Sequence, residues 1–222
     1  MAGRVSYYGG IVKDRLVLDL DAGKQASYVS GSTTWNDISY TNNNSTLVNG
    51  PAYSSENGGT ILFDGSDDFA TINSATTINS TTEFTFSIWV KSSIIATEQM
   101  LFQCANATLS GWNFEIYQSK FLLQCYPGGG FTQATTIMSS NVWYNLVGTY
   151  ANGSQVFYNN GVQNGTASRT FTPSSAQIVI GKWINSPLPL TGNIGQILFY
   201  NKVLSAAEVL QNYNATKSRF GY

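Results

Sequence analysis

The sequence predicts an all-β fold: two antiparallel sheets packed as a jelly-roll sandwich, with one short C-terminal helix. Residues 83–91 alternate strictly between apolar and polar sides, as a half-buried strand requires. The same period of two recurs along the chain between turn residues. Two Asn-Gly pairs between short alternating runs add the strongest local signal for hairpins. The apolar side of the first run holds Phe84, Phe86, Ile88 and Val90.

The periodicity places roughly twelve to fourteen strands along the chain, more than the ~7–9 of an immunoglobulin domain. Residues 24–59 are polar and predicted to be loop-rich, with Trp35 and residues 47–48 anchoring the loops to the core. The clearest predicted strands are 16–20, 60–63, 69–72, 83–91, 99–104, 111–118, 120–126, 142–150, 154–159, 177–180 and 194–200.

The helix is predicted near the C-terminus, where Ser205 and Glu208 have the spacing of a capping box. We expect this helix to cover a sheet edge or to close one end of the core. Residues 1–13 form a predicted N-terminal arm, and residues 14–222 form a single domain. The arm is too apolar for a free tail, so it packs on its own domain or docks on a partner. Its candidate docking residues are Tyr7, Tyr8, Ile11 and Val12.

The composition excludes several classes of function. Charged residues make up 10% of the chain and the net charge is -1, so the basic face that a nucleic-acid-binding protein needs is missing. No apolar run is long enough to span a membrane. The first residues lack the apolar core of a signal peptide, which predicts synthesis in a cytoplasm.

The two cysteines, Cys104 and Cys125, are predicted to be buried free thiols. One strand is predicted between them. Next-nearest strands lie ~9–10 Å apart, which is beyond the reach of a disulfide.

Several segments, in order, resemble the laminin-G-like branch of the concanavalin A-like lectin/glucanase superfamily. The resemblance covers roughly residues 14–216. The segments that carry it are Leu18–Gly23, Trp35-Asn36-Asp37, Leu47–Pro51, Ile61–Phe69, Phe84–Val90, Trp143–Val147 with Val156–Gly161, and Leu190–Ile194 with Ser205–Glu208. It implies a concanavalin A-like sandwich that serves as a sugar-binding, protein-binding or structural module. Similar loop patterns recur in structural proteins of tailed phages.

Enzymatic activity is not expected. The glucanases of the superfamily use a Glu-x-Asp-x-Glu strand, and none of the glutamates here belongs to such a triplet. The sequence has no histidine, which excludes imidazole bases and His-ligated zinc.

A possible cation site is the turn that holds Asp64, Asp67 and Asp68. Carboxylates of this kind bind calcium, the one cofactor considered. The alternative is that Asp64 and Asp67 cap the turn through Asx-type hydrogen bonds while Asp68 faces solvent. Calcium occurs in laminin-G relatives, but no ligand set is transferred from them.

Four aromatic residues are candidates for stacking on a sugar ring. Trp183 precedes a Pro-rich loop, and Tyr126 and Phe131 flank the Gly128–Gly130 loop. Trp89 lies opposite Phe86 and Ile88 in parity, so it faces a second layer or solvent. Trp112, by contrast, is predicted to lie in the core.

The sequence favours a non-enzymatic virion structural protein, a capsid decoration or tail-fibre component that docks on other virion proteins or on copies of itself. The alternative is an adhesin module that binds cell-surface glycans, with or without calcium. In both cases we expect the chain at the virion surface, without nucleic acid or membrane as a partner.

Overall fold

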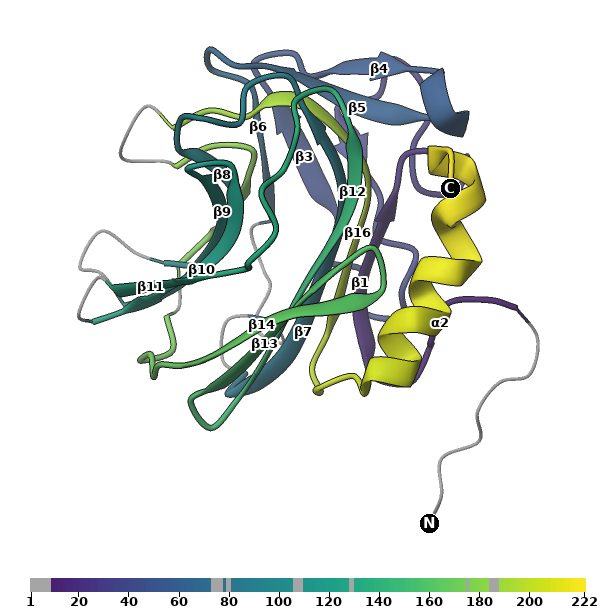
Figure 1. Ribbon diagram of the computed structural model, residues 1–222. Coiled ribbons are helices and arrows are strands. Elements are labelled where there is room, and N and C mark those ends of the chain that lie inside the picture. Colours follow the sequence, from purple (N-terminus) through teal and green to yellow (C-terminus); the bar gives the residue numbers. More distant parts are fainter. Residues whose placement is uncertain are drawn as a thin grey trace.

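Two antiparallel eight-stranded sheets pack face to face in the structure (Figure 1). It is a computed structural model that describes residues 9–72, 78, 81–105, 110–127, 130–174, 176–183 and 188–222. The predicted fold class is confirmed: the described part is mostly β, with one short α-helix near the C-terminus.

Sheet A has the strand order β14-β13-β12-β7-β16-β5-β4, with β1 paired to β16. The long strand β16 takes two neighbours on one side because its first half pairs with β5 and its second half with β1. Its strands are β1 (Leu16–Asp21), β4 (Ala52–Ser54), β5 (Thr60–Asp64), β7 (Glu83–Ser92), β12 (Trp143–Ala151), β13 (Ser154–Asn159), β14 (Val162–Ser168) and β16 (Thr191–Tyr200).

Sheet B has the order β11-β10-β9-β8-β15-β6-β3-β2. Figure 1 shows this sheet curved, with its hollow side turned away from sheet A and the helix. Its strands are β2 (Thr34–Trp35), β3 (Ser45–Val48), β6 (Phe69–Ile72), β8 (Gln99–Gln103), β9 (Gly111–Tyr117), β10 (Lys120–Tyr126), β11 (Gly130–Gln133) and β15 (Ile178–Ile180).

Aromatic rings fill the space between the sheets. Phe84 of β7 stacks on Trp112 of β9 with ring centroids 4.5 Å apart, and Phe86 stacks on Phe114 at the same distance. All four side chains are fully buried, Trp112 as predicted. Such rings remove large apolar areas from water and add favourable pairwise geometry. The in-out alternation of β7 and β9 therefore determines which side of each sheet faces the core.

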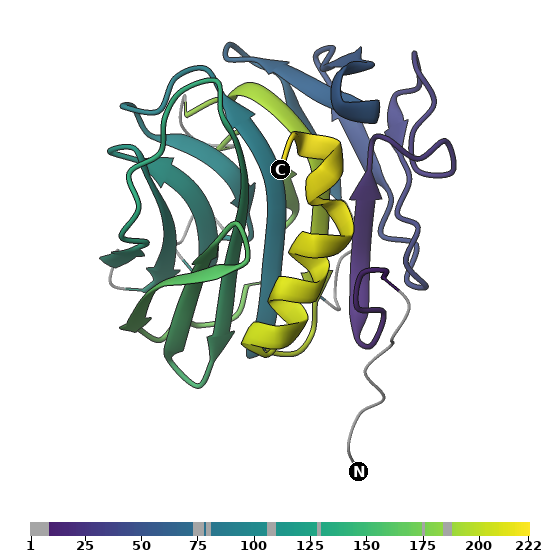
Figure 2. The same ribbon diagram turned by 45° about the vertical axis from the view of Figure 1, so that its right-hand side comes forward.

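The outer face of sheet A is covered by helix α2 (Ala206–Thr216) and the short 3-10 helix η2 (Lys217–Phe220) (Figure 2). The predicted capping box is present, since Ser205 and Glu208 bond reciprocally. Trp89 lies beneath this cover, 1% exposed, with its ring 4.2 Å from that of Phe220. Among the described residues, no helix is long and apolar enough to cross a membrane.

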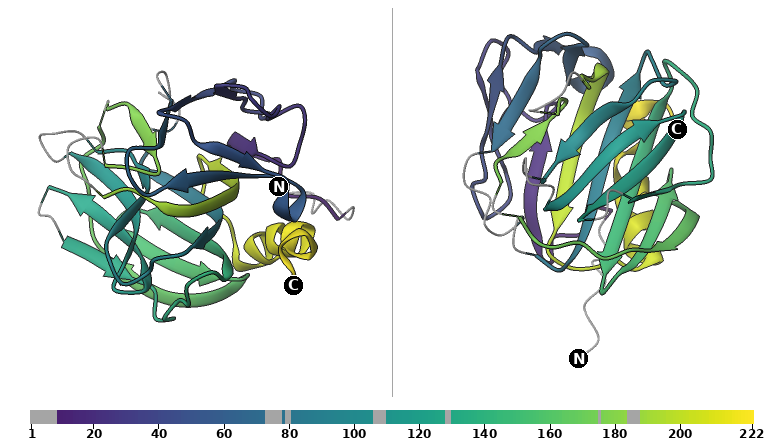
Figure 3. Two further views of the ribbon diagram at one scale, coloured as in Figure 1. Left: turned by 90° about the horizontal axis from the view of Figure 1, so that it is seen from above. Right: turned by 90° about the vertical axis from the view of Figure 1, so that its left-hand side faces the viewer.

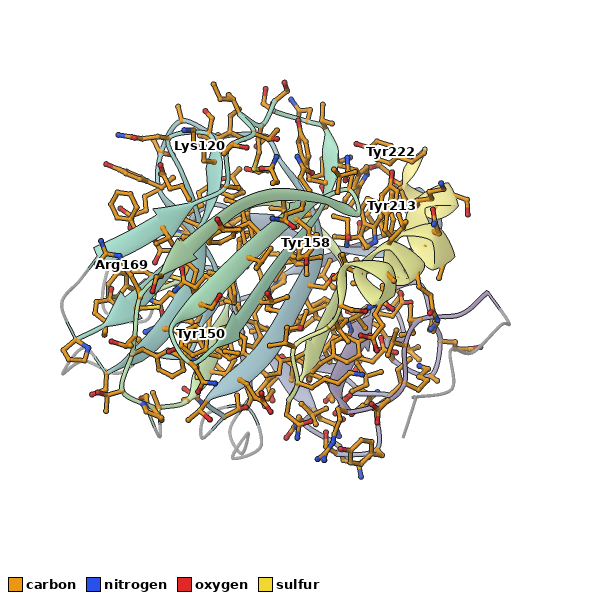
Figure 4. The ribbon with its side chains drawn as sticks, turned by 60° about the horizontal axis from the view of Figure 1, so that its bottom comes forward. Lys120, Tyr150, Tyr158, Arg169, Tyr213 and Tyr222 are labelled. Atoms are coloured by element: carbon orange, nitrogen blue, oxygen red, sulfur yellow. The ribbon has the colours of Figure 1, made fainter. Side chains whose placement is uncertain are left out.

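The C-terminus is held to the N-terminal half of the chain by Arg219. Its guanidinium forms an ion pair with Asp21 of β1 and donates hydrogen bonds to the carbonyls of Asn57 and Gly59. Figure 4 shows Tyr213 and Tyr222 beside each other at this end of the helix.

The structure has more strands than the periodicity indicated. Strands β2, β3 and β4 lie within the stretch predicted to be loops, and β11 and β14 extend hairpins beyond their predicted ends. These strands are short or largely exposed, so they carry little of the apolar alternation that reveals a strand. Cys104 and Cys125 are buried free thiols, as expected.

Candidate functional site

The face of sheet B that points away from sheet A is seen in Figure 3, right. The strand alternation places polar side chains on it, opposite the side chains that pack into the core. In β9, Trp112 and Phe114 point into the core. Asn113 lies between these two residues and Glu115 follows them. Both must point to the other side of the sheet because side chains alternate along a strand. Both are nevertheless buried, with 0% and 1% of their surfaces exposed. These two residues form what we call the floor of the site.

The strand register extends the floor into two rows. Residues paired directly across an antiparallel sheet share one face. The first row is Gln103, Asn113, Gln124 and Phe131. The second row is Met100, Glu115, Leu122 and Gln133.

Two aromatic rings meet over the floor. Tyr126 ends β10 and Trp183 follows β15, and β9 and β8 lie between those strands. Three strand spacings amount to ~14 Å, yet the two ring centroids are 6.4 Å apart in an edge-to-face contact. The side chains therefore reach toward each other across the sheet. Tyr126 is fixed by a 2.7 Å hydrogen bond from its hydroxyl to Gln124 Oε1.

A second aromatic pair lies on the same side of the sheet. Phe131 meets the ring of Tyr117 edge to face at 5.7 Å. Phe131 is 43% exposed, so the ring is accessible from solvent.

Several polar atoms of the floor and its surroundings have no hydrogen-bond partner among the described residues. They are Asn113 Nδ2 and Oδ1, Glu115 Oε1, Gln133 Nε2 and Trp183 Nε1. A buried polar group left without a partner costs roughly 1–3 kcal/mol. Six other buried polar atoms of the described residues also lack a partner, but they are spread over both sheets and the loops. A group of five on one face can be satisfied by water or a ligand.

The floor also contains two carboxyl groups in contact. Burial raises the pKa of Glu115 most, and a hydrogen bond to Glu98 with the charge of that neighbour raises it further. A hydrogen-bonding contact with the Asn113 side chain lowers this pKa, so Asn113 and Glu115 partly satisfy each other. Burial dominates, and Glu115 therefore keeps a proton at neutral pH.

The structure brings some of the predicted ligand-stacking residues together and separates one. Trp183, Tyr126 and Phe131 share the hollow side of sheet B. The prediction for Trp89 is wrong, because it faces the second layer: helix α2 and Phe220 cover its ring, and its Nε1 donates to Thr216 Oγ1. It lies on sheet A, on the opposite side of the molecule.

The carboxylates of Asp64, Asp67 and Asp68 each have an oxygen within 4.8 Å of the others. Asp68 is 4% exposed and its Oδ2 accepts from the Asp64 backbone N at 3.0 Å, while Asp64 Oδ1 accepts from Ser66 N at 2.8 Å. Burial raises the pKa of Asp68. Asp64 caps the turn as the alternative to calcium predicted. The expectation that Asp68 faces solvent is wrong, because Asp68 is buried and accepts from the Asp64 backbone. The carboxylate spacing also suits a cation.

Of the four candidate docking residues, Val12 packs on its own domain. It is 8% exposed, its N–H donates to Asn212 Oδ1, and its carbonyl accepts from the Tyr200 hydroxyl. Ile11 packs against the same apolar cluster. Val12 is therefore not a free docking residue, because its bonds are satisfied within the domain. Tyr7 and Tyr8 lie outside the described residues.

Sequence reasoning missed the floor. Asn113 and Glu115 were visible as polar residues alternating with Trp112 and Phe114, a pattern that every half-exposed strand shows. The contact of Glu98 with Glu115 joins separate segments, and no local pattern reports it. The strand parity identified the side on which these residues lie, but not their burial.

Solved structures with a similar fold are binding domains and parts of enzymes. The binding domain of Paraclostridial Mosquitocidal Protein 1 matches with a TM-score of 0.73 and 17% identity over 91% of this chain. The receptor-binding domain of botulinum neurotoxin type G matches with a TM-score of 0.69 and 16% identity over 90% of this chain. The chain spans about half the length of these two, 52% and 51%.

A third structure is matched over its whole length. Domain 4 of an extracellular arabinanase from Geobacillus stearothermophilus, in complex with arabinotriose, has a TM-score of 0.69 and 14% identity. The match covers 91% of this chain and 100% of that one. At these identities the likeness concerns the fold. A search of curated proteins finds no significant match.

The family model that matches is of the laminin-G type and covers residues 64–210, most of the chain. The matched segment runs from the end of β5 into helix α2 and so includes strands of both sheets, while β1 to β4 precede it. The chain belongs to the concanavalin A-like lectin/glucanases superfamily.

Proposed function

We propose that this chain is a non-catalytic carbohydrate-recognition module that binds a glycan on the hollow face of sheet B. The observation that carries the proposal is the group of buried polar atoms without partners beneath Tyr126 and Trp183. Sugar hydroxyls donate and accept hydrogen bonds, and sugar rings present apolar faces. A floor with free donors and acceptors under aromatic rings complements both properties.

The ligand would reach the floor by displacing the Trp183 ring from Tyr126. An edge-to-face aromatic pair contributes about 0.5–1.5 kcal/mol, so its separation is a small cost. Hydrogen bonds to Asn113 and Glu115 would offset this cost because both now have unpartnered atoms. The displaced indole could then stack on the bound ring.

The structural neighbours support this proposal at the level of fold. One is an arabinanase domain in complex with arabinotriose, and it matches over its entire length. Others are binding domains of toxins. In other proteins, therefore, sandwiches of this shape include a domain solved with a bound oligosaccharide and domains named for binding.

The carboxyl groups on this face argue against glycoside hydrolysis. Retaining glycosidases hold two carboxyls ≈ 5–5.5 Å apart, and inverting ones hold them ≈ 6.5–9.5 Å apart. Glu115 is instead buried and protonated, and the neighbouring Glu98 raises its pKa further, so the pair lacks the spaced acid and base that either mechanism requires. A binding role agrees with this arrangement.

A glycan array followed by calorimetric titration tests the proposal. Trp183→Ala and Asn113→Ala should each weaken binding of any hit at least tenfold. Tyr40→Ala is the matched control, since Tyr40 is an aromatic residue 69% exposed and far from the floor in the chain. Thermal unfolding of each variant separates loss of the site from loss of the fold. An array without hits, with and without calcium, would refute the proposal.

The virion setting stays a prediction from the sequence, as do docking through the arm and location at a particle surface. A carbohydrate-recognition module on a virion would contact host glycans, so the two predictions are compatible. Co-purification of the chain with intact particles tests the setting. Its recovery only as free protein would contradict it.

A further inference from the structure

A second aromatic contact lies on the hollow face, to one side of the floor. Phe131 of β11 is in register with Gln124 of β10. Tyr117 of β9 is in register with Lys120, so Leu122 lies midway between these two levels of β10. The rings of Phe131 and Tyr117 meet at 5.7 Å, so their contact passes over Leu122. Leu122 is accordingly 1% exposed, although it is not part of the core between the sheets. We call Phe131, Tyr117 and Leu122 the second platform.

The second platform has a free hydrogen-bond donor beside it. Gln133 is paired directly with Leu122, so the two side chains share the hollow face. The Nε2 atom of Gln133 is buried and has no partner among the described residues. The floor offers the same combination, because Asn113 has unpartnered atoms near the rings of Tyr126 and Trp183. Aromatic rings with a free polar atom therefore occur at two places on one face.

These two places are too far apart for a single sugar ring. Asn113 lies on β9 and Gln133 lies on β11, and two strand spacings amount to ~9.6 Å. One pyranose ring is about as long as one strand spacing. Gln124 of β10 lies between Asn113 and Phe131 in the same row. It is half-buried, and its Oε1 accepts from the Tyr126 hydroxyl at 2.7 Å. The polar surface therefore continues from the floor to the second platform.

We propose that the hollow face of sheet B binds a chain of at least two linked sugar units laid across strands β9 to β11, one over Asn113 and the next on the second platform. This inference rests on the proposed carbohydrate-binding function and defines its ligand class as oligosaccharides rather than single sugars. The first unit lies beside Tyr126 and Trp183. The second stacks on Phe131, which is 43% exposed, and its oxygens accept from Gln133 Nε2. Once the first unit is bound, the glycosidic link holds the second at a high effective concentration, so affinity rises with chain length.

Ladders of linked sugars provide the test. We would titrate one to four linked units of xylose, arabinose and glucose, and of the main-chain sugar of any array hit, into the full chain by calorimetry. In any ladder that binds, the three-unit member should bind at least tenfold more tightly than the single sugar, with one molecule per chain. Phe131→Ala and Gln133→Ala should each reduce this gain at least threefold. Tyr40→Ala, which removes an exposed aromatic residue outside the strands of sheet B, should leave the gain unaltered.

The outcomes separate this inference from the function on which it rests. Equal affinity for one unit and for three would overturn the extended site and leave carbohydrate binding in place. Two three-unit molecules bound per chain would also overturn it, because the floor and the second platform would then be separate sites. An unchanged gain in Phe131→Ala and Gln133→Ala, with unfolding temperature and circular dichroism showing an intact fold, would refute the place assigned to the second unit. Absence of binding by every ladder and every array glycan would refute the proposed function, and the extended site with it.

Discussion

The free energy of unfolding of the wild type should decrease as the pH rises from 5 to 8, and replacing Glu115 with glutamine should remove most of this decrease. Burial and the neighbouring Glu98 raise the pKa of Glu115 from 4.5 to about 9 in the folded state. Between these values the folded chain binds one proton more than the unfolded chain. The free energy of unfolding of the wild type therefore decreases with increasing pH in this window. Glu115→Gln does not titrate, so it lacks this decrease.

The size of the effect follows from proton linkage. A full difference of one proton changes the free energy of unfolding by about 1.4 kcal/mol per pH unit. From pH 5 to pH 8 the upper bound is about 4 kcal/mol. The Asn113 side chain lowers the pKa of Glu115 in part, so we expect the stability advantage of the variant to grow by about 2–4 kcal/mol over this range.

Urea unfolding at pH 5, 6, 7 and 8 measures this difference directly. Glu83→Gln corrects for the change in net charge, and Glu98→Gln should flatten the pH dependence in part by removing the charged neighbour. Parallel stability curves for the wild type and Glu115→Gln would show that Glu115 is ionised or solvated at neutral pH. The inferred floor, with its protonated Glu115, would then be wrong.

Three further substitutions test the rest of the structure. Trp89→Ala should lower the free energy of unfolding by about 3–5 kcal/mol in urea titrations, because it empties the space under Phe220; a loss below 1 kcal/mol would contradict the burial. Arg219→Ala should cost about 1–3 kcal/mol in the same assay, because it removes the ion pair with Asp21 and the bonds to two carbonyls while Lys24 still pairs with Asp21, and Arg219→Lys should recover only part of it. Asp68→Ala should lower stability by about 1–2 kcal/mol with and without calcium alike, and a loss seen only in calcium would indicate a cation site instead.

The fold was largely predictable because its determinants are local. The alternation of β7, the Asn-Gly turns and the capping box at Ser205 each lie within a few residues of sequence, and each appears in the structure as expected. The short strands β2 and β4 were not recognised, since two or three residues are too few to show a period. Their pairing is decided by the neighbouring strand rather than by their own side chains.

The site was less predictable because it combines distant segments. Trp183 and Tyr126 were each recognisable as aromatic residues near glycine- or proline-rich loops, but their contact depends on the order of four strands in sheet B. The alternation in β7 allowed Trp89 to face either a second layer or solvent. The packing of the C-terminal segment against its ring shows that it faces a second layer. The alternation in β9 showed on which side Glu115 lies, but its burial depends on the pairing of β9 with β8 and β10, which no local pattern reports.

The two outer faces of the sandwich differ in a way that indicates which one binds a ligand. On sheet A the outward Trp89 is apolar, and the chain covers it with its own C-terminal segment. On sheet B the outward Asn113 and Glu115 are polar and buried, and three of their side-chain atoms have no hydrogen-bond partner in the described residues. On sheet A one such atom, Asn145 Oδ1, lies beside Trp89. Leucine in place of Asn113 and Glu115 would avoid that cost and would suit burial better. A floor that remains polar at the expense of stability is expected where a ligand supplies the missing hydrogen bonds.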